Sequence, residues 1–245
     1  MKKPYIKKRG QIGNLKIWVV NGNYIRNNLD VEFTNCGEHY VFPFIPKDEL
    51  WLDEEFGTKD EKHYIDYLLT EYSLMSKGVS YDNALIKADL IQKREIQKEK
   101  GFKQLKKLKE KENYKLIEKI HKKLLKTYSD HLKVWIIDGK IVREIYFIDF
   151  VEGGHDKVYS FVPKNEIWID DDISQKERKL ILLHEAHERY LMSKGFTYRD
   201  AHASSSRIEH KYRTNKIGLD EALKKEILNN DKLIKKETEV GYLHY

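Results

Sequence analysis

The pattern of hydrophobic and polar positions occurs twice, 117 residues apart. Apolar runs rich in β-forming residues, LKIWVV and LKVWII, begin at Leu15 and Leu132, and each is followed by an NG or DG dipeptide. Later segments match in the same register, FIPKDELWLDEE with FVPKNEIWIDDD and YSLMSKGVSYDNA with RYLMSKGFTYRDA. From Leu15 to Ala84 about a third of the positions are identical, without a gap. We infer an internal duplication, because chance does not give an ungapped match of this length.

Each copy is predicted to contain four strands. The first is the apolar run itself, and the NG or DG dipeptide predicts a hairpin turn into a second strand that ends near Phe33 or Phe150. Gly37 and Gly154 are expected to mark a further turn. The segments HYVFPFIP and KVYSFVP predict third strands, and ELWLD and EIWID, which alternate around a tryptophan, predict short fourth strands.

Two helices are predicted to follow the strands in each copy. The first spans about 59–77 or 176–194, and a glycine after each marks its end. Ser80 and Thr197 are expected to cap the second helix. The predicted fold is therefore α+β, a tandem duplication of a ββββαα unit.

The remaining segments are rich in charge. The segment between the copies interleaves Lys and Glu with spaced apolar residues, which predicts a charged helical connector of one or two amphipathic helices. A shorter helix, packing back on the domain, is expected in the tail. The predicted organisation is a first repeat with a degenerate site at 1–92, the connector at 93–131, a second repeat with the site at 132–213, and a C-terminal helical tail at 214–245.

Composition narrows the class of protein. Charged residues make up 35% of the chain, so much of it must be solvated, while the 12% aromatic residues exclude wholesale disorder. No apolar run approaches the length of about 18 residues that is needed to span a bilayer. The net charge of +6 is compatible with an acidic partner but is modest for a dedicated nucleic-acid binder. Cys36 is the single cysteine, so no intrachain disulfide can form. The N-terminal segment lacks the features of a signal peptide. We expect a cytoplasmic protein.

Comparing the two copies isolates the candidate chemistry. On the two helices of the second copy, polar or ionisable residues stand at five positions where the first copy has other residues. Three of the first-copy residues, Tyr67, Leu68 and Leu85, are candidates for its core. The exchanges are Tyr67 to His184, Leu68 to Glu185, Thr70 to His187, Leu85 to His202 and Gln92 to Glu209. Glu188 has the counterpart Glu71. Burying such groups costs several kcal/mol unless they are paired, hydrogen-bonded or bound to a metal.

These residues suit a divalent cation. His184 and Glu188 lie one helical turn apart, and imidazole nitrogen and carboxylate oxygen are both ordinary zinc ligands. A third ligand is expected from the next helix, His202 first and Glu209 second. His187 could serve as an alternative ligand, an acid or a hydrogen-bond donor to the transition state.

The segments HEAHE and AHASSSRIEH resemble the active-site helix and the ligand-bearing second helix of small zincin-like metallopeptidases. They are also similar to compact phage and prokaryotic proteins with an H-E-x-x-E-type helix. The resemblance covers residues 182–210 and implies a metal at His184, Glu188 and His202, with Glu185 as the general base that takes a proton from water. The departure from H-E-x-x-H is Glu188, where that motif has its second histidine.

Three functions stay open at this point. The first is a metal-dependent hydrolase, most like a metallopeptidase, that uses zinc and acts on a peptide or protein. The second is a non-enzymatic interaction protein of a phage or mobile element, in which the His/Glu cluster is structural or holds a structural ion. The third is a nucleic-acid-binding protein that uses the Lys-rich connector. Individual ligands could instead be core or surface residues, His155 is interpreted as a silent loop histidine, and the oligomeric state is undetermined.

Overall fold

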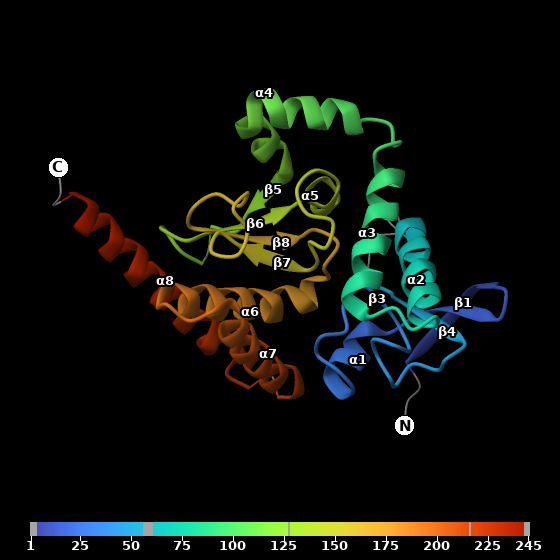
Figure 1. Cartoon of the computed structure of the whole chain (residues 1–245). Helices are drawn as coiled ribbons and strands as arrows, with labels where there is room; N and C mark the ends of the chain where they lie inside the picture. The colour runs from blue at the N-terminus through green and yellow to red at the C-terminus, as the bar shows by residue number, and fades with distance from the viewer. Residues whose placement is uncertain (1–3, 56–60, 127, 216, 243–245) are drawn as a thin grey trace. The chain divides into compact units, whose positions relative to one another are not determined.

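The computed structural model describes residues 4–55, 61–126, 128–215 and 217–242. Its architecture is α+β, with two similar four-stranded mixed sheets and their helices (Figure 1). The predicted fold class is therefore confirmed.

The chain divides into two compact units, and unit 1 includes a short segment of the second copy. Unit 1 comprises Met1–Leu116 and Lys140–Asp149, and unit 2 comprises Ile117–Gly139 and Phe150–Tyr245. Each unit contains one complete sheet.

The elements follow the duplication. In the first copy they are β1 (Tyr5–Ile12), β2 (Leu15–Val20), α1 (Gly22–Asn28), β3 (Cys36–Glu38), β4 (Glu49–Asp53), α2 (Glu61–Met75) and α3 (Tyr81–Ile96). The helix α4 (Phe102–Ile120) then leads to the second copy. This copy contains β5 (His121–Leu124), β6 (Lys133–Ile137), α5 (Gly139–Ile145), β7 (Gly153–His155), β8 (Glu166–Asp170), α6 (Gln175–Ser193) and α7 (Tyr198–Thr214), and α8 (Leu219–Tyr242) follows.

Both sheets have the same topology. The strand orders are β1-β2-β4-β3 and β5-β6-β8-β7. The two central strands of each sheet are parallel, with Trp18 opposite Trp51 and Trp135 opposite Trp168, and the outer pairs are antiparallel. A parallel pair needs a crossover connection rather than a hairpin. The short helix and the third strand of each copy lie within that connection.

The hairpins predicted at the NG and DG dipeptides are wrong. The structure begins helices α1 and α5 there. Asn21 is the N-cap of α1, and its side-chain oxygen accepts a hydrogen bond from the N–H of Tyr24 at 2.6 Å. Asparagine and glycine are favoured both in tight turns and at helix N-termini. The parallel pairing of the flanking strands, which the local sequence does not reveal, selects the helix.

The predicted third strands are also misplaced. Gly37 and Gly154, expected in turns, lie in β3 and β7, while the segments after them form loops. A Cβ on Gly37 would crowd Phe42, and one on Gly154 would crowd Tyr159, so the loop aromatics pack against these glycines. The predicted fourth strands are confirmed as β4 and β8.

The helices after each sheet are confirmed. α2 and α6 occupy the predicted segments, although the predicted start of the former falls outside the described residues. The connector is not purely helical, because α4 has a break in its helical backbone at Glu112 and is followed by β5, an edge strand of the second sheet. The tail helix α8 is longer than expected and packs against α6.

The core of unit 2 holds α6 in place. Figure 1 shows α6 between the second sheet and α7, and it also contacts α8. The apolar face of α6 is buried with residues from the sheet and from α8. This core contains Leu132, Val134, Ile136, Ile167, Ile169, Ile173, Ile181, Leu182, Leu183, Ala186, Leu223, Ile227 and Ile234. This packing fixes α6 on one side, and its residues His184, His187 and Glu188 contact side chains of α7.

Replacing Gly22 by alanine should destabilise unit 1. A Cβ on this residue would overlap the carboxylate of Asp53, which is buried and pairs with Arg26. Forcing a methyl group into a packed site costs about 1–3 kcal/mol. Urea unfolding of Gly22→Ala measures this loss. The matched control is Gly10→Ala, because a Cβ there meets nothing within 4 Å, and we expect its stability to change by no more than about 0.5 kcal/mol. Equal stability of the two variants would contradict this account.

Candidate metal centre

Two helices of unit 2 carry the predicted site residues. His184, Glu185 and Glu188 lie on α6, and His202 and Glu209 lie on α7. Because residues four apart share one face of a helix, His184 and Glu188 point to the same side. The two helices pack against each other along this face. The structure thus brings together groups that are separated in the sequence.

Three ligand atoms converge on one point between the helices. Nδ1 of His202 lies 2.8 Å from Oε2 of Glu188 and 3.2 Å from Nε2 of His184. Nε2 of His184 lies 3.6 Å from the same Glu188 oxygen. All three atoms lie within 4.8 Å of one another, close enough to hold one metal ion after small adjustments. The three residues expected to bind first are therefore neighbours.

Glu209 occupies a different place from the other three. Its Oε2 accepts a hydrogen bond from Nδ1 of His184 at 2.8 Å, on the side of the ring away from Glu188 and His202. Glu209 is held in turn by Arg213, which also pairs with the buried Glu177. A carboxylate on the second nitrogen of a ligating histidine fixes the orientation of its ring. The geometry favours Glu209 as a partner of His184 rather than as a fourth ligand.

The cluster also includes His155, for which the sequence predicts a silent loop histidine. His155, at the end of β7, is fully buried, and its Nε2 lies 3.1 Å from Oε1 of Glu188. His155, Glu185 and Glu188 form a second group with ligand atoms within 4.8 Å of one another. Comparison of the two copies could have identified His155, because the first copy has Glu38 at this position.

His187 contacts residues outside this cluster. Its Nε2 lies 3.0 Å from Oγ of Ser204 on α7, and its Nδ1 lies 3.3 Å from Oε1 of Glu226 on α8. His187 therefore joins α6 to the two helices that pack against it. The structure gives no support to the expectation that His187 acts at the metal.

The charges in the cluster depend on one another. Burial raises the pKa of Glu188, but hydrogen bonds from His155, His184 and His202 outweigh it and hold this pKa well below its usual value. Burial lowers the pKa of His184, yet its hydrogen bonds with Glu188 and Glu209 raise it well above the usual value. Glu188 is therefore ionised, and His184 holds its proton firmly without a metal. A metal must displace such a proton to bind.

The pKa of Glu185 is shifted in the opposite direction from the pKa of Glu188. Burial raises the pKa of Glu185 to about 8, and the nearby charge of Glu188 acts in the same direction. A divalent cation is usually the largest charge in its site and favours the ionised form of a nearby carboxyl group. Binding of an ion would therefore shift Glu185 toward the carboxylate that a general base requires.

The corresponding site of the first copy lacks these ligands. Tyr67 stands in place of His184 and donates a hydrogen bond to Oε1 of Glu71 at 3.1 Å. Glu71 has no histidine among its described partners; burial, together with the charge of Glu38, raises its pKa to about 7. The same scaffold thus raises the pKa of this carboxyl group in one copy and lowers it in the other.

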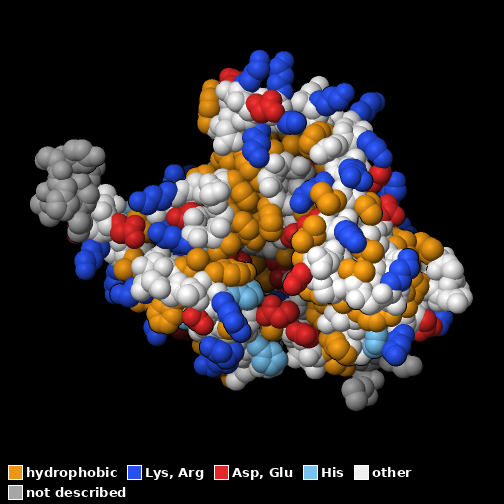
Figure 2. Space-filling model, in the orientation of Figure 1, with side chains coloured by type: hydrophobic (Ala, Val, Ile, Leu, Met, Phe, Trp, Pro, Cys, Tyr) orange, Lys and Arg blue, Asp and Glu red, His pale blue; other side chains and the backbone are white. Residues whose placement is uncertain are grey.

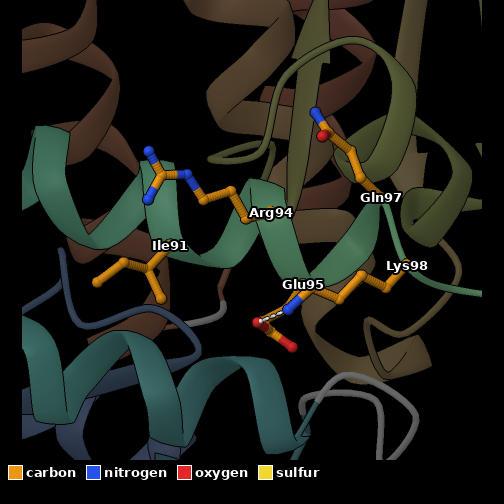
Figure 3. Close-up of a pocket in the computed structure, with 5 residues that line it drawn as sticks. All are labelled: Ile91, Arg94, Glu95, Gln97 and Lys98. Carbon is orange, nitrogen blue, oxygen red and sulfur yellow. Dashed lines mark hydrogen bonds and ion pairs between the residues drawn. The ribbon is translucent and has the colours of Figure 1, made fainter.

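A surface pocket of unit 1 offers no comparable constellation. It has a volume of about 520 Å³ and is lined by α3 and the residues after it. Figure 3 shows its side chains fanning out in different directions, with Glu95 and Lys98 paired at 2.6 Å. No common point is presented to a ligand.

Comparison with known proteins assigns no family to this chain. No protein-family model matches the chain, and neither a curated protein nor a solved structure matches it significantly. Among the described residues, none of the helices combines the length and the apolar character needed to cross a membrane.

Replacing Glu71 by glutamine should stabilise unit 1 at pH 8. Between the ordinary pKa of a glutamate, 4.5, and its folded value of about 7, Glu71 is protonated in the fold but ionised in the unfolded chain. Stability therefore falls as pH rises through this window, by about 3 kcal/mol at most. Glu71→Gln removes this loss, so its advantage should appear at pH 8 and vanish at pH 4. Urea unfolding, read by hydrogen exchange of the β4 peptide, measures it.

The matched control is Glu188→Gln in metal-free buffer, read at the β8 peptide of unit 2. Its effect should have the opposite sign, because Glu188 is ionised and receives hydrogen bonds from three histidines. Destabilisation by Glu71→Gln at pH 8 would show that this carboxyl group is ionised and paired in the fold.

Proposed function

We propose that the second copy is a metal-dependent hydrolase of the zincin-like metallopeptidase type. The observation that carries the proposal is the convergence of His184, Glu188 and His202 on one point, with Glu209 behind the first ligand. Two histidines and one carboxylate are a familiar ligand set for catalytic zinc, and a carboxylate behind a histidine is the usual support of such a ligand. Zinc is therefore the proposed cation.

The chemistry follows from the residues around the ion. A divalent ion there would supply Lewis-acid polarisation of a substrate carbonyl and of water. Glu185, on the same helix, has an oxygen within 4.8 Å of Glu188 and is the proposed base that takes the proton from water. His202 is about one-third exposed, so the cluster is open to solvent on the α7 side. The proposed substrate is a peptide or protein, and the proposed compartment is the reducing cytoplasm.

The alternative within the same geometry is a structural cluster. Glu188 receives contacts from three histidines without any ion. In that case the protein is a non-enzymatic interaction protein, and its polar network fixes α7 against α6. A structural ion, held without turnover, is the intermediate case.

Nucleic-acid binding is the other alternative. Figure 2 shows lysine and arginine side chains gathered over α4. Several of its lysines are exposed, among them Lys103, Lys106, Lys107 and Lys111. Oligonucleotide binding with a log–log salt slope of about one unit per phosphate contact would support this function.

Purified protein loaded with zinc and passed through a desalting column should retain one ion per chain. His184→Ala and His202→Ala should each lose it, because each removes one of three protein ligands. Elemental analysis by mass spectrometry gives the stoichiometry. The control is His187→Ala on the same helix, which should keep the ion because His187 contacts Ser204 and Glu226 instead. A wild-type protein without stoichiometric zinc would exclude the proposed function.

Glu185→Gln should keep the ion and lose hydrolysis by about 10²–10⁴-fold, because glutamine cannot accept the proton. Zinc-loaded protein is incubated with a peptide library, and the products are identified by mass spectrometry. Wild-type protein that holds zinc but cleaves nothing would leave the structural ion as the better account. Equal cleavage by the wild type and Glu185→Gln would exclude Glu185 as the base.

A further inference from the structure

Both ring nitrogens of the buried His155 have defined partners. The backbone N–H of Lys157 donates a hydrogen bond to Nδ1 at 3.2 Å. On the other side, Nε2 lies 3.1 Å from Oε1 of Glu188. The ring is fully buried. These contacts determine where the proton of this histidine lies.

A neutral imidazole carries one N–H and one acceptor nitrogen. A backbone N–H can only donate, so Nδ1 of His155 must be the acceptor. The proton therefore lies on Nε2 and is donated to the carboxylate of Glu188. Nε2 then has no lone pair for a metal, and the same hydrogen bond at Nδ1 opposes the other tautomer.

His184 has the opposite arrangement. Its Nδ1 faces the carboxylate of Glu209, which can only accept, so Nδ1 carries a proton. The lone pair of Nε2 becomes available toward Glu188 and His202 once any second proton leaves. Ligating histidines in proteins donate their second N–H to a carboxylate or carbonyl in this way. The two histidines thus differ in tautomer and in what they can bind.

In both copies, the side chain at the end of the third strand accepts a hydrogen bond from the backbone N–H two residues later. Tyr40 corresponds to Lys157, and its backbone N–H donates to Oε2 of Glu38 at 2.8 Å. The loop therefore directs the same N–H at the end of the third strand in both copies. A histidine at this position keeps the acceptor and adds an N–H toward the α6 glutamate.

Arg189, the residue of α6 that follows Glu188, binds the loop that follows His155. Arg189 pairs with Asp156 through two nitrogens, at 2.6 and 3.1 Å, and also binds Asn165. Consecutive residues of α6, Glu188 and Arg189, thus bind consecutive residues of the loop, His155 and Asp156. These two adjacent contacts fix the position of α6 relative to the loop after β7.

We propose that His155 is a positioning residue for the metal centre: its Nε2–H holds Oε1 of Glu188 and leaves Oε2 for the ion. The proposal rests on the proposed function, because it assumes an ion between His184, Glu188 and His202. It assigns the second group of possible ligands, formed by His155, Glu185 and Glu188, a hydrogen-bonding role instead of a second ion. The centre is therefore mononuclear.

The test is nitrogen-15 NMR of the histidine rings in the full-length protein loaded with cadmium-113. Coupling to cadmium should appear at Nε2 of His184 and Nδ1 of His202, while His155 shows no coupling and keeps its proton on Nε2 before and after loading. Coupling at His155, or a proton on its Nδ1, would overturn the proposal. Absence of coupling at every histidine would instead exclude the proposed metal site, so the two failures are distinguishable.

Variants give a second readout. His155→Leu removes the donor and should weaken zinc binding about 10–100-fold, measured by competition with a chelator. His155→Gln offers an amide N–H near the same place and should recover part of that affinity. His187→Gln is the control and should leave affinity unchanged, because the ring of His187 contacts Ser204 and Glu226 instead of Glu188. Equal affinities of His155→Leu and the wild type would also overturn the proposal.

Discussion

The buried carboxylate of Glu188 is the constraint on which the site of the second copy depends. An ionised group in a packed interior is stable only when it is paired and hydrogen-bonded. Here it lies between His155 at the end of a strand, His184 on its own helix and His202 on the next helix. One charge therefore ties together β7, α6 and α7. The same arrangement leaves two nitrogens and one oxygen close enough to share a cation.

The two copies stabilise a buried glutamate at the same position in two different ways. Both copies use the same strand order, the same parallel central pair and a glutamate on the first long helix. In the first copy the neighbours of that glutamate are Tyr67 and Glu38, and protonation relieves its burial. In the second copy the neighbours are histidines, so the carboxylate keeps its charge. The topology is shared between the copies, while the pKa of this glutamate is shifted in opposite directions.

The site also depends on residues outside the cluster of His184, Glu188 and His202. Arg213 connects Glu209 to Glu177, and Glu209 in turn orients His184. Arg189 fastens the loop beside His155. Such supports hold the side chains of the cluster in place, so less conformational order would have to be imposed on binding of the proposed ion. The long helix α8 takes part through the apolar core that it shares with α6.

The sequence by itself determined the duplication, the α+β class, the Trp-centred strands, the paired helices and the residues that distinguish the second copy. These features follow from local periodicity and from comparison at a fixed offset. Only the tertiary structure decided that Asn21-Gly22 begins a helix, because parallel strand pairing is a long-range property. It alone placed Glu209 behind His184, turned His187 toward Ser204 and brought His155 to Glu188. The direction of a side chain depends on the packing angle between elements, and no local pattern in the sequence encodes that angle.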